Sequence, residues 1–223
     1  MDNNDLCIMY KDSSLTVCLK PVGLESEGEG MPRLLERQLG GPIFCVHRLD
    51  KAVGGLMVFA RTKQAAAALS AAVSRRELEK EYLCVVPGAP APAQGLMRDL
   101  LYRDPAKNKS FVVKRPRRGV KEAELAYTLL ERGMENSLVR VSLHTGRSHQ
   151  IRVQFASRAL PLLGDVKYGS RERRCTIALW SCRLAFRHPV TGKPLDFTAL
   201  PPASFPWDAF SCLSGDETPP PAE

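Results

Sequence analysis

The feature that most constrains this chain is a charged stretch that runs directly into an apolar strand. Residues 46–51, Val-His-Arg-Leu-Asp-Lys, place Asp50 between Arg48 and Lys51, and two glycines follow shortly afterwards. Residues 56–60 are then uniformly apolar, which is typical of a buried strand. A carboxylate at the mouth of a core strand is a candidate nucleophile or base, because cationic neighbours favour its ionised form. A salt bridge in a surface loop explains the same residues.

Apolar and polar segments alternate along the rest of the chain in a pattern that suits an α/β or α+β domain. We expect Thr62 to cap a helix, because Ala65, Leu69 and Val73 follow at helical spacing. The expected strands are residues 6–10, 15–19, 56–60, 80–86, 122–130, 138–143, 176–186 and 195–200. The expected helices are residues 31–38, 62–78 and 151–160.

Composition limits the class of protein. No apolar run approaches the ~20 residues that cross a membrane, and the acidic N-terminus lacks the basic region of a signal peptide. The seven cysteines form no Cys-x-x-Cys pair, which is typical of reduced thiols and argues against a zinc site. We therefore expect a cytoplasmic protein without a bound metal.

Positive charge is concentrated in two segments of the chain. The net charge is +8, and residues 98–121 and 145–187 each hold nine Lys or Arg against two acidic residues. The remainder is net acidic, so the two segments favour a surface that binds a polyanion. Two solvated surface segments are the alternative. Within the first, proline and glycine among the charges of residues 114–119 predict an exposed loop or hairpin tip.

Three polar clusters lie at the ends of expected strands or at the start of a helix, where sites usually form. The first is Arg48 with Asp50, the second is Tyr82, and the third lies in residues 147–152, Arg-Ser-His-Gln-Ile-Arg. Arg152 would hold Asp50 ionised, and Tyr82 could stack on a planar substrate or move a proton. Taken singly, Tyr82 is better explained as a core tyrosine and Arg152 as part of an ion pair on a helix face.

The motif His-Arg-Leu-Asp at residues 47–50, with its apolar strand, resembles the signature of the RluA-type pseudouridine synthases. Five further segments resemble elements of that family in the family's order, and the resemblance covers residues 6 to about 202. These segments are Lys-Pro-Val-Gly-Leu at 20–24, Lys-Glu-Tyr at 80–82, Thr-Gly-Arg-Ser-His-Gln-Ile-Arg-Val at 145–153, Leu-Gly-Asp-Val-Lys-Tyr-Gly at 163–169 and Phe-Arg-His-Pro at 186–189.

The resemblance implies an enzyme that isomerises uridine to pseudouridine in rRNA or tRNA. Asp50 matches the family's nucleophile, which would attack the ribose anomeric carbon. Tyr82 matches the tyrosine that stacks on the base and accepts a proton, and Arg152 matches the arginine that pairs with the aspartate. Arg48 matches the arginine that helps to hold the flipped-out nucleotide. The remaining residues expected to contact RNA are His47, Arg147, His149, Gln150 and Lys167.

The resemblance also implies the architecture, an α+β pseudouridine synthase fold with a mixed, mostly antiparallel sheet flanked by helices and loops. We expect residues 1–210 to form the catalytic domain and residues 211–223 a disordered Pro-rich tail. We expect a monomer that needs no cofactor. No small RNA-binding domain is expected before Leu6, so the catalytic domain or partners would select the RNA.

The chain departs from the family pattern at two places. Val53-Gly54-Gly55 stands where the family usually has Thr-Ser-Gly, and Leu179-Trp180-Ser181 where it often has Leu-His-Ala. The loss of two hydroxyls beside Asp50 keeps an alternative open, a catalytically silent RNA-binding protein that retains the fold. A small-molecule hydrolase that uses Asp50 and a histidine is a second alternative. The charge distribution and the lack of a Gly-x-Ser-x-Gly elbow argue against it.

Overall fold

The computed structural model describes residues 5–214, which are organised around one 11-stranded sheet. The main path of the sheet is β1-β2-β4-β10-β5-β9-β8-β6-β7, while β11 pairs with β10 and β3 pairs with β4. Among the described strands, β4 and β10 form the one parallel pair, at Trp180 opposite Gly54, and every other pairing is antiparallel. This confirms the predicted α+β fold with a mixed, mostly antiparallel sheet.

The strands are β1 (Ile8–Lys11), β2 (Leu15–Lys20), β3 (Phe44–Cys45), β4 (Gly54–Ala60), β5 (Glu79–Pro87), β6 (Gln94–Asp104), β7 (Lys109–Val113), β8 (Val120–Arg132), β9 (Asn136–Leu143), β10 (Leu179–Arg187) and β11 (Pro194–Thr198). The α-helices are α1 (Met31–Leu39), α2 (Lys63–Ser74) and α3 (Gln150–Ala156), and three short 3-10 helices are η1 (Val166–Tyr168), η2 (Trp207–Ala209) and η3 (Ser211–Leu213).

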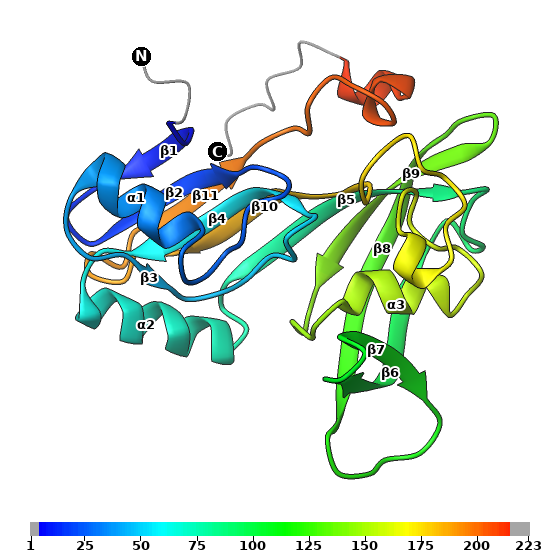
Figure 1. The fold of residues 1–223 in the computed structure, drawn as a ribbon, viewed down its shortest axis with the longest axis horizontal. Coiled ribbons are helices and arrows are strands. Elements are labelled where there is room, and N and C mark those ends of the chain that lie inside the picture. Colours follow the sequence, from blue (N-terminus) through cyan, green and yellow to red (C-terminus); the bar gives the residue numbers. More distant parts are fainter. Residues whose placement is uncertain (1–4, 215–223) are drawn as a thin grey trace.

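The sheet joins two lobes, which Figure 1 shows side by side. One lobe carries β1 to β4 with α1 and α2, and the other carries β6 to β9 with α3; β10 and β5 run between them. Strand β4 is buried along its whole length, as its apolar sequence predicts. Leu69 of α2 packs against Leu56 and Val58 of β4 in one core cluster, so α2 covers one face of this lobe.

The helix predicted to follow Thr62 forms where expected but ends early. The Thr62 hydroxyl accepts a hydrogen bond from the Ala65 amide at 3.1 Å, which is the predicted N-cap. The helix stops at Ser74, because Arg76 adopts a left-handed backbone conformation with φ of 63°. Leu78, predicted as the helix end, is instead buried at the entrance to β5.

Strands β6 and β7 were not predicted. Residues 114–119 form the predicted exposed loop but not a hairpin tip, because the flanking strands β7 and β8 each pair with β6 and not with each other. Residues 94–104 and 109–113 are antiparallel partners, and β6 also pairs with β8 over nine register positions. Their charged side chains hide the period-two pattern because only one face of this arm is buried. The arm formed by β6, β7 and β8 projects from the body of the molecule (Figure 1).

The first residues of the predicted tail are folded. Residues 211–213 form η3, and the amides of Ser211 and Cys212 donate to the Glu131 carboxylate at 3.0 and 2.9 Å. The expectation of disorder is therefore wrong for these residues, and residues 215–223 lie outside the described part of the chain. Within residues 5–214, no helix is long and apolar enough to cross a membrane.

Candidate active site

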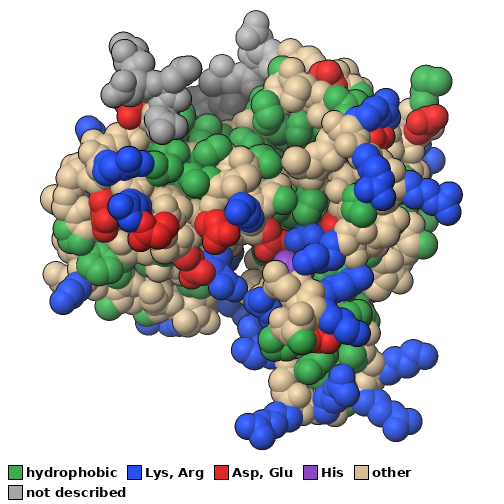
Figure 2. Space-filling model, in the orientation of Figure 1, with side chains coloured by type: hydrophobic (Ala, Val, Ile, Leu, Met, Phe, Trp, Pro, Cys, Tyr) green, Lys and Arg blue, Asp and Glu red, His purple; other side chains and the backbone are tan. Residues whose placement is uncertain are grey.

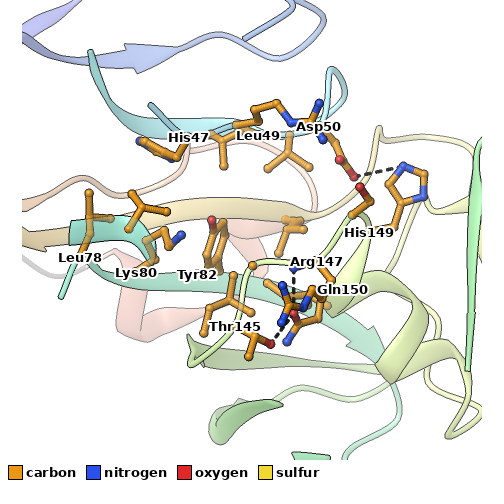
Figure 3. A pocket seen from close by; sticks show the side chains of 18 of the residues that line it. His47, Leu49, Asp50, Leu78, Lys80, Tyr82, Thr145, Arg147, His149 and Gln150 are labelled. Carbon is orange, nitrogen blue, oxygen red and sulfur yellow. Dashed lines mark hydrogen bonds and ion pairs between the residues drawn. The ribbon is translucent and has the colours of Figure 1, made fainter. Parts of the chain in front are cut away.

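A pocket of about 620 Å³ opens between the two lobes. Its walls are the loop that precedes β4, the start of β5, and the loop from β9 into α3. The volume lies within the ~300–1,000 Å³ range of small-molecule sites. Every site residue predicted from the sequence lines this pocket except Lys167. Figure 3 shows His47 and Lys80 toward one end of the pocket and Asp50 and His149 toward the other.

The loop that carries Asp50 is pinned on both sides of the carboxylate. The hydroxyl of Ser26 bonds both backbone groups of Leu49, accepting from its amide at 3.0 Å and donating to its carbonyl at 2.7 Å. The ammonium of Lys20 donates to the carbonyl of Lys51 at 3.2 Å and is itself fully buried. These bonds fix the backbone around Asp50, so its carboxylate is presented to the pocket from a rigid loop.

Arg152 holds the Asp50 carboxylate, as the sequence predicts. Arg152 is the third residue of α3 and is only 6% exposed. Its Nη1 donates to Asp50 Oδ2 at 2.7 Å. Residues 102 positions apart in the chain are thus joined by a charge-assisted hydrogen bond. The side chain of Asp50 remains 28% exposed, so one face of the carboxylate is open to a ligand.

The two cations next to Asp50 in the sequence are not its partners. Arg48 pairs with Glu27 at 3.1 Å, and Lys51 pairs with Glu25 at 3.3 Å, both at the exposed surface. The prediction that Arg48 and Lys51 lie against the Asp50 carboxylate and stabilise its charge is therefore wrong. In an extended loop, neighbouring side chains point to different sides, and only Asp50 turns toward the buried arginine.

Asp165 completes this ion cluster and was not predicted from the sequence. It is 1% exposed and binds Arg152 through both oxygens, with Nε–Oδ2 at 2.7 Å and Nη2–Oδ1 at 2.9 Å. Burial lowers the pKa of Arg152, but the carboxylates of Asp165 and Asp50 outweigh it, so the net shift is upward. The signal was present in Leu163-Gly164-Asp165, a carboxylate within an otherwise apolar and glycine-containing run.

Tyr82 lies in the pocket wall on β5 and is 5% exposed. Its burial, and then the nearby negative charge of Asp50, raise the pKa of the phenol. The side chain is therefore a protonated phenol at neutral pH and a hydrogen-bond donor. Its aromatic body can stack against a planar ligand, while its role as a proton acceptor stays a prediction.

His149 stands beside Asp50 in the pocket. Its backbone is left-handed, with φ of 55°, and its Nε2 lies 3.7 Å from Asp50 Oδ2. Its Nδ1 is bonded to the hydroxyl of Tyr168 at 3.0 Å, and that ring also lies 5.1 Å below the Arg152 guanidinium. Burial lowers the pKa of His149, although Asp50 opposes the shift, so the imidazole is neutral near pH 7.

The other predicted contacts divide into structural and exposed residues. Both amide atoms of Gln150 are engaged inside the protein, with Oε1 accepting from Thr145 Oγ1 and the Arg147 amide, and Nε2 donating to the Glu124 carbonyl. Gln150 thus shapes the loop, and its geometry gives no support to direct RNA contact. Arg147 is half-buried at the rim, where its Nε donates to the Glu122 carbonyl at 2.9 Å. Lys167 is exposed and lies outside the pocket.

The departures from the family pattern at residues 54 and 180 meet in space. A Cβ on Gly54 would stand 2.5 Å from a ring carbon of Trp180, so this indole occupies the volume of a side chain at 54. The indole Nε1 donates to the Ala199 carbonyl at 2.9 Å, which anchors the ring. Val53 is 2% exposed and packs in the core. The two departures are therefore one compensated change in packing.

Positive side chains lie along one side of the pocket and cover the projecting arm. In Figure 2, Lys and Arg side chains gather on the arm and along the adjoining side of the hollow, while acidic side chains lie on the facing lobe. Arg117 of the arm tip packs 4.5 Å from the Tyr102 ring. The described residues hold no group of three or more His, Cys, Asp or Glu placed to bind a metal ion.

Comparison with known proteins gives a consistent set of relatives. The family described as RNA pseudouridylate synthase matches residues 5–157. The dual-specificity RNA pseudouridine synthase RluA of Escherichia coli strain K12 is 35% identical over 216 residues, which are 90% of this chain and 94% of the relative. Ribosomal large subunit pseudouridine synthase D of Neisseria meningitidis serogroup A is 34% identical, over 94% of this chain but 60% of its own length.

Solved structures with the same fold are more distant in sequence. Human RNA Pseudouridylate Synthase Domain Containing 1 has a TM-score of 0.76 at 22% identity and covers 90% of this chain and 84% of its own. Human RNA Pseudouridylate Synthase Domain Containing 4 has a TM-score of 0.73 at 24% identity and covers 88% of each chain. At these identities the likeness concerns the fold alone.

Proposed function

This chain belongs to the RluA-type branch of the RNA pseudouridylate synthase family, a family of isomerases, and we propose that it converts uridine to pseudouridine within RNA with Asp50 as nucleophile. The observation that carries the proposal is the meeting of Asp50, Arg152 and Tyr82 in one pocket. Three residues from distant segments supply an open carboxylate, a buried cation that orients it, and an aromatic wall.

In the first half of the proposed reaction, a carboxylate oxygen of Asp50 attacks the anomeric carbon C1′ of the target uridine. The C1′–N1 bond breaks as the C1′–Oδ bond forms, and uracil leaves as an anion. Arg152 orients the attacking carboxylate, and Asp165 keeps the arginine in place. The uridine must leave its stack to reach the pocket, and the Tyr82 ring provides a surface for the extruded base.

In the second half, the uracil turns so that C5 faces C1′. The C1′–C5 bond forms, the C1′–Oδ bond breaks, the C5 proton is lost and N1 takes up a proton. Formation of the ester removes the Asp50 charge, which is one of the two main causes of the raised pKa of Tyr82. The phenol is therefore a better proton relay at the stage where the C5 proton leaves.

The substrate class that we propose is structured ribosomal RNA, with tRNA as the second candidate. Two relatives are named as a ribosomal large subunit synthase and a dual-specificity RNA synthase, which supports this choice. The positive arm and pocket rim suit a folded polyanion. All seven cysteines are free thiols, which supports a reducing cytoplasmic location.

The experiment that tests the proposal maps pseudouridines in rRNA and tRNA from cells with and without this gene. We expect one or a few sites to disappear in the deletion strain and to return with the wild-type gene. The Asp50→Asn gene should fail to restore them, whereas Asp196→Asn, which alters an exposed carboxylate bound to Arg183, should restore them. Identical maps in all strains would favour the alternative of a catalytically silent RNA-binding protein.

A further inference from the structure

His47 carries a buried N–H group that no atom of residues 5–214 accepts. Its Nε2 lies 3.1 Å from the amide of Val58, and because a backbone amide can only donate, Nε2 is the acceptor. The proton of the neutral ring therefore sits on Nδ1. Burial, together with the positive charge of Lys80, lowers the pKa of His47 to about 3, so the ring stays neutral. Nδ1 is buried and has no partner among residues 5–214.

Lys80 is a half-buried cation at the same end of the pocket, and it has no salt-bridge partner among the described residues. Burial lowers the pKa of its ammonium. A partly desolvated charge without a counterion is costly, and natural proteins place one where an anion binds or where chemistry needs it. Lys80 lines the pocket, so its ammonium is available to a ligand.

His47 and Lys80 both line the pocket and lie toward the same end of it. Lys80 acts on the pKa of His47, and Figure 3 shows both side chains in the same part of the pocket. A Cβ on Gly146 would stand 3.6 Å from Lys80 Nζ, so the glycine leaves the space above the ammonium free. Lys80 also shares a face of β5 with Tyr82, two residues along the strand and therefore about 6.7 Å away.

We propose that Lys80 and His47 form a phosphate subsite, which binds the phosphodiester directly next to the target uridine. This inference rests on the proposed function, because it places the uracil on Tyr82. The two donors, one of them charged, match the non-bridging oxygens of a phosphodiester. A base carbonyl would accept a hydrogen bond but would leave the buried charge of Lys80 uncompensated. The separation from Tyr82 is about that between a base and a phosphate of its own nucleotide.

The test measures binding of the single-uridine RNA pentamer AAUAA to the full chain at several KCl concentrations. Lys80→Met removes the charge and keeps the length of the side chain. We expect it to weaken binding about tenfold at low salt and to reduce the slope of log K against log[salt] by about 0.7, the contribution of one phosphate on a single strand. Lys63→Met, on the exposed start of α2, is the matched control and should leave the slope unchanged.

A second measurement leaves the protein intact. AAUAA is synthesised with one neutral methylphosphonate linkage, placed on either side of the uridine. One of the two RNAs should bind wild-type protein about tenfold more weakly and should bind Lys80→Met as well as the unmodified RNA does. Any of three results would overturn the proposed subsite. AAUAA does not bind the wild-type protein, Lys80→Met does not change the salt slope, or the methylphosphonate weakens binding to wild type and to Lys80→Met equally.

Failure of the subsite and failure of the proposed function give different results. If wild-type protein forms pseudouridine in cells but the Lys80 variant keeps the full salt slope, the subsite alone is wrong. If the pseudouridine maps do not change with the gene but the slope and the methylphosphonate effect appear as expected, the chain binds RNA through this subsite without the proposed reaction.

Discussion

At the scale of single residues, the site depends on how Arg152 is shared between two carboxylates. Asp165 is buried and binds the arginine through two bonds, whereas Asp50 binds it through one and faces the pocket. The charge of Arg152 is therefore compensated even when the Asp50 charge is consumed in an ester. Asp165 fixes the guanidinium, and the guanidinium in turn orients the nucleophile that we propose.

We expect Asp165→Asn to destabilise the protein strongly, because it leaves a buried arginine with only a partly exposed partner. The free energy of unfolding, measured by urea denaturation, should fall by about 3–5 kcal/mol. The matched control is Asp196→Asn, which breaks a pair with Arg183 that is half exposed and should cost less than about 1 kcal/mol. Equal effects of the two substitutions would show that Asp165 does not support a buried charge.

The sequence predicted which residues matter better than it predicted their contacts. Asp50, Tyr82 and Arg152 were singled out together because each matches a motif of the family that the sequence resembles, and the structure brings all three into one pocket. Arg48 and Lys51 were wrongly expected to contact Asp50, because proximity along the chain says little about side-chain direction. Asp165 was missed because its partner lies 13 residues away, across a turn that no local pattern predicts.

At the scale of elements, the parallel pairing of β4 with β10 holds the start of β4, into which the Asp50 loop leads. Trp180 lies opposite Gly54 in this pairing and fills the space above it. Gly55 follows with φ of 116°, and a Cβ there would stand 2.3 Å from the Ser181 carbonyl oxygen, so both glycines are required by close packing. Position 54 has no room for a serine side chain, because the indole of Trp180 occupies that space.

A double-mutant cycle tests this compensation. Gly54→Ser alone should lower the free energy of unfolding by about 1–3 kcal/mol, because the new side chain overlaps the indole. Gly54→Ser with Trp180→His should be less destabilised than the sum of the two single variants, with a coupling of about 1 kcal/mol or more in urea denaturation. Additive effects would contradict direct contact between the two positions.

The N-terminal hairpin is tied to the hairpin of β10 and β11 by Asp12. Its carboxylate accepts from the amides of Ser14 and Leu15 at 2.7 and 2.9 Å, and its Oδ2 lies 2.7 Å from His188 Nε2. Burial raises the pKa of Asp12, but these hydrogen bonds outweigh it and lower the pKa to about 2. The unfolded value is about 3.9, so the folded state favours the ionised carboxylate.

The stability that Asp12 supplies should therefore depend on acid pH. It should be fully present above about pH 4 and lost as the pH falls toward 2, because the folded-state pKa is depressed. We expect Asp12→Asn to be about 1–2 kcal/mol less stable than wild type at pH 6 in urea denaturation, with the difference shrinking below pH 4. A difference that does not change between pH 6 and pH 2 would rule out the ionised carboxylate as its source.

The prediction of elements succeeded where the hydrophobic pattern was strong. The apolar run of β4 was expected at nearly its observed bounds, and the capped, alanine-rich α2 begins where expected but ends at Ser74, four residues early. Strands β6 and β7 were missed because the arm is thin, so few of its residues are buried and its charged faces mask the alternation. The parallel pairing of β4 with β10 joins segments more than 100 residues apart, which no local pattern encodes.

At the scale of the whole molecule, the charge distribution suits a polyanion that lies across the pocket and along the arm. The tip between β7 and β8 carries Lys114, Arg115 and Arg118, all of them exposed. These side chains do not line the pocket, so we expect them to contact backbone phosphates flanking the target site. Such contacts add affinity and salt dependence without reading sequence.

We expect the triple variant Lys114→Ser, Arg115→Ser and Arg118→Ser to bind ribosomal RNA more weakly at low salt. The slope of log K against log[salt] should decrease by about two to three, because each phosphate contact contributes about 0.7–0.9. The matched control replaces three exposed cations that do not line the pocket, Arg37, Lys63 and Arg132. Equal loss in both triple variants would indicate general electrostatic attraction in place of a binding face.

The most direct test of the central claim, catalysis by Asp50, is the release of tritium from RNA that carries tritium at C5 of uridine. Isomerisation replaces the C5–H bond by a C5–C1′ bond, so each turnover sends one label into water. With RNA from the deletion strain, wild-type protein should release tritium, and Asp50→Asn should release it at least about 10⁴-fold more slowly while it still binds the RNA. Release by Asp50→Asn at the wild-type rate would contradict the account.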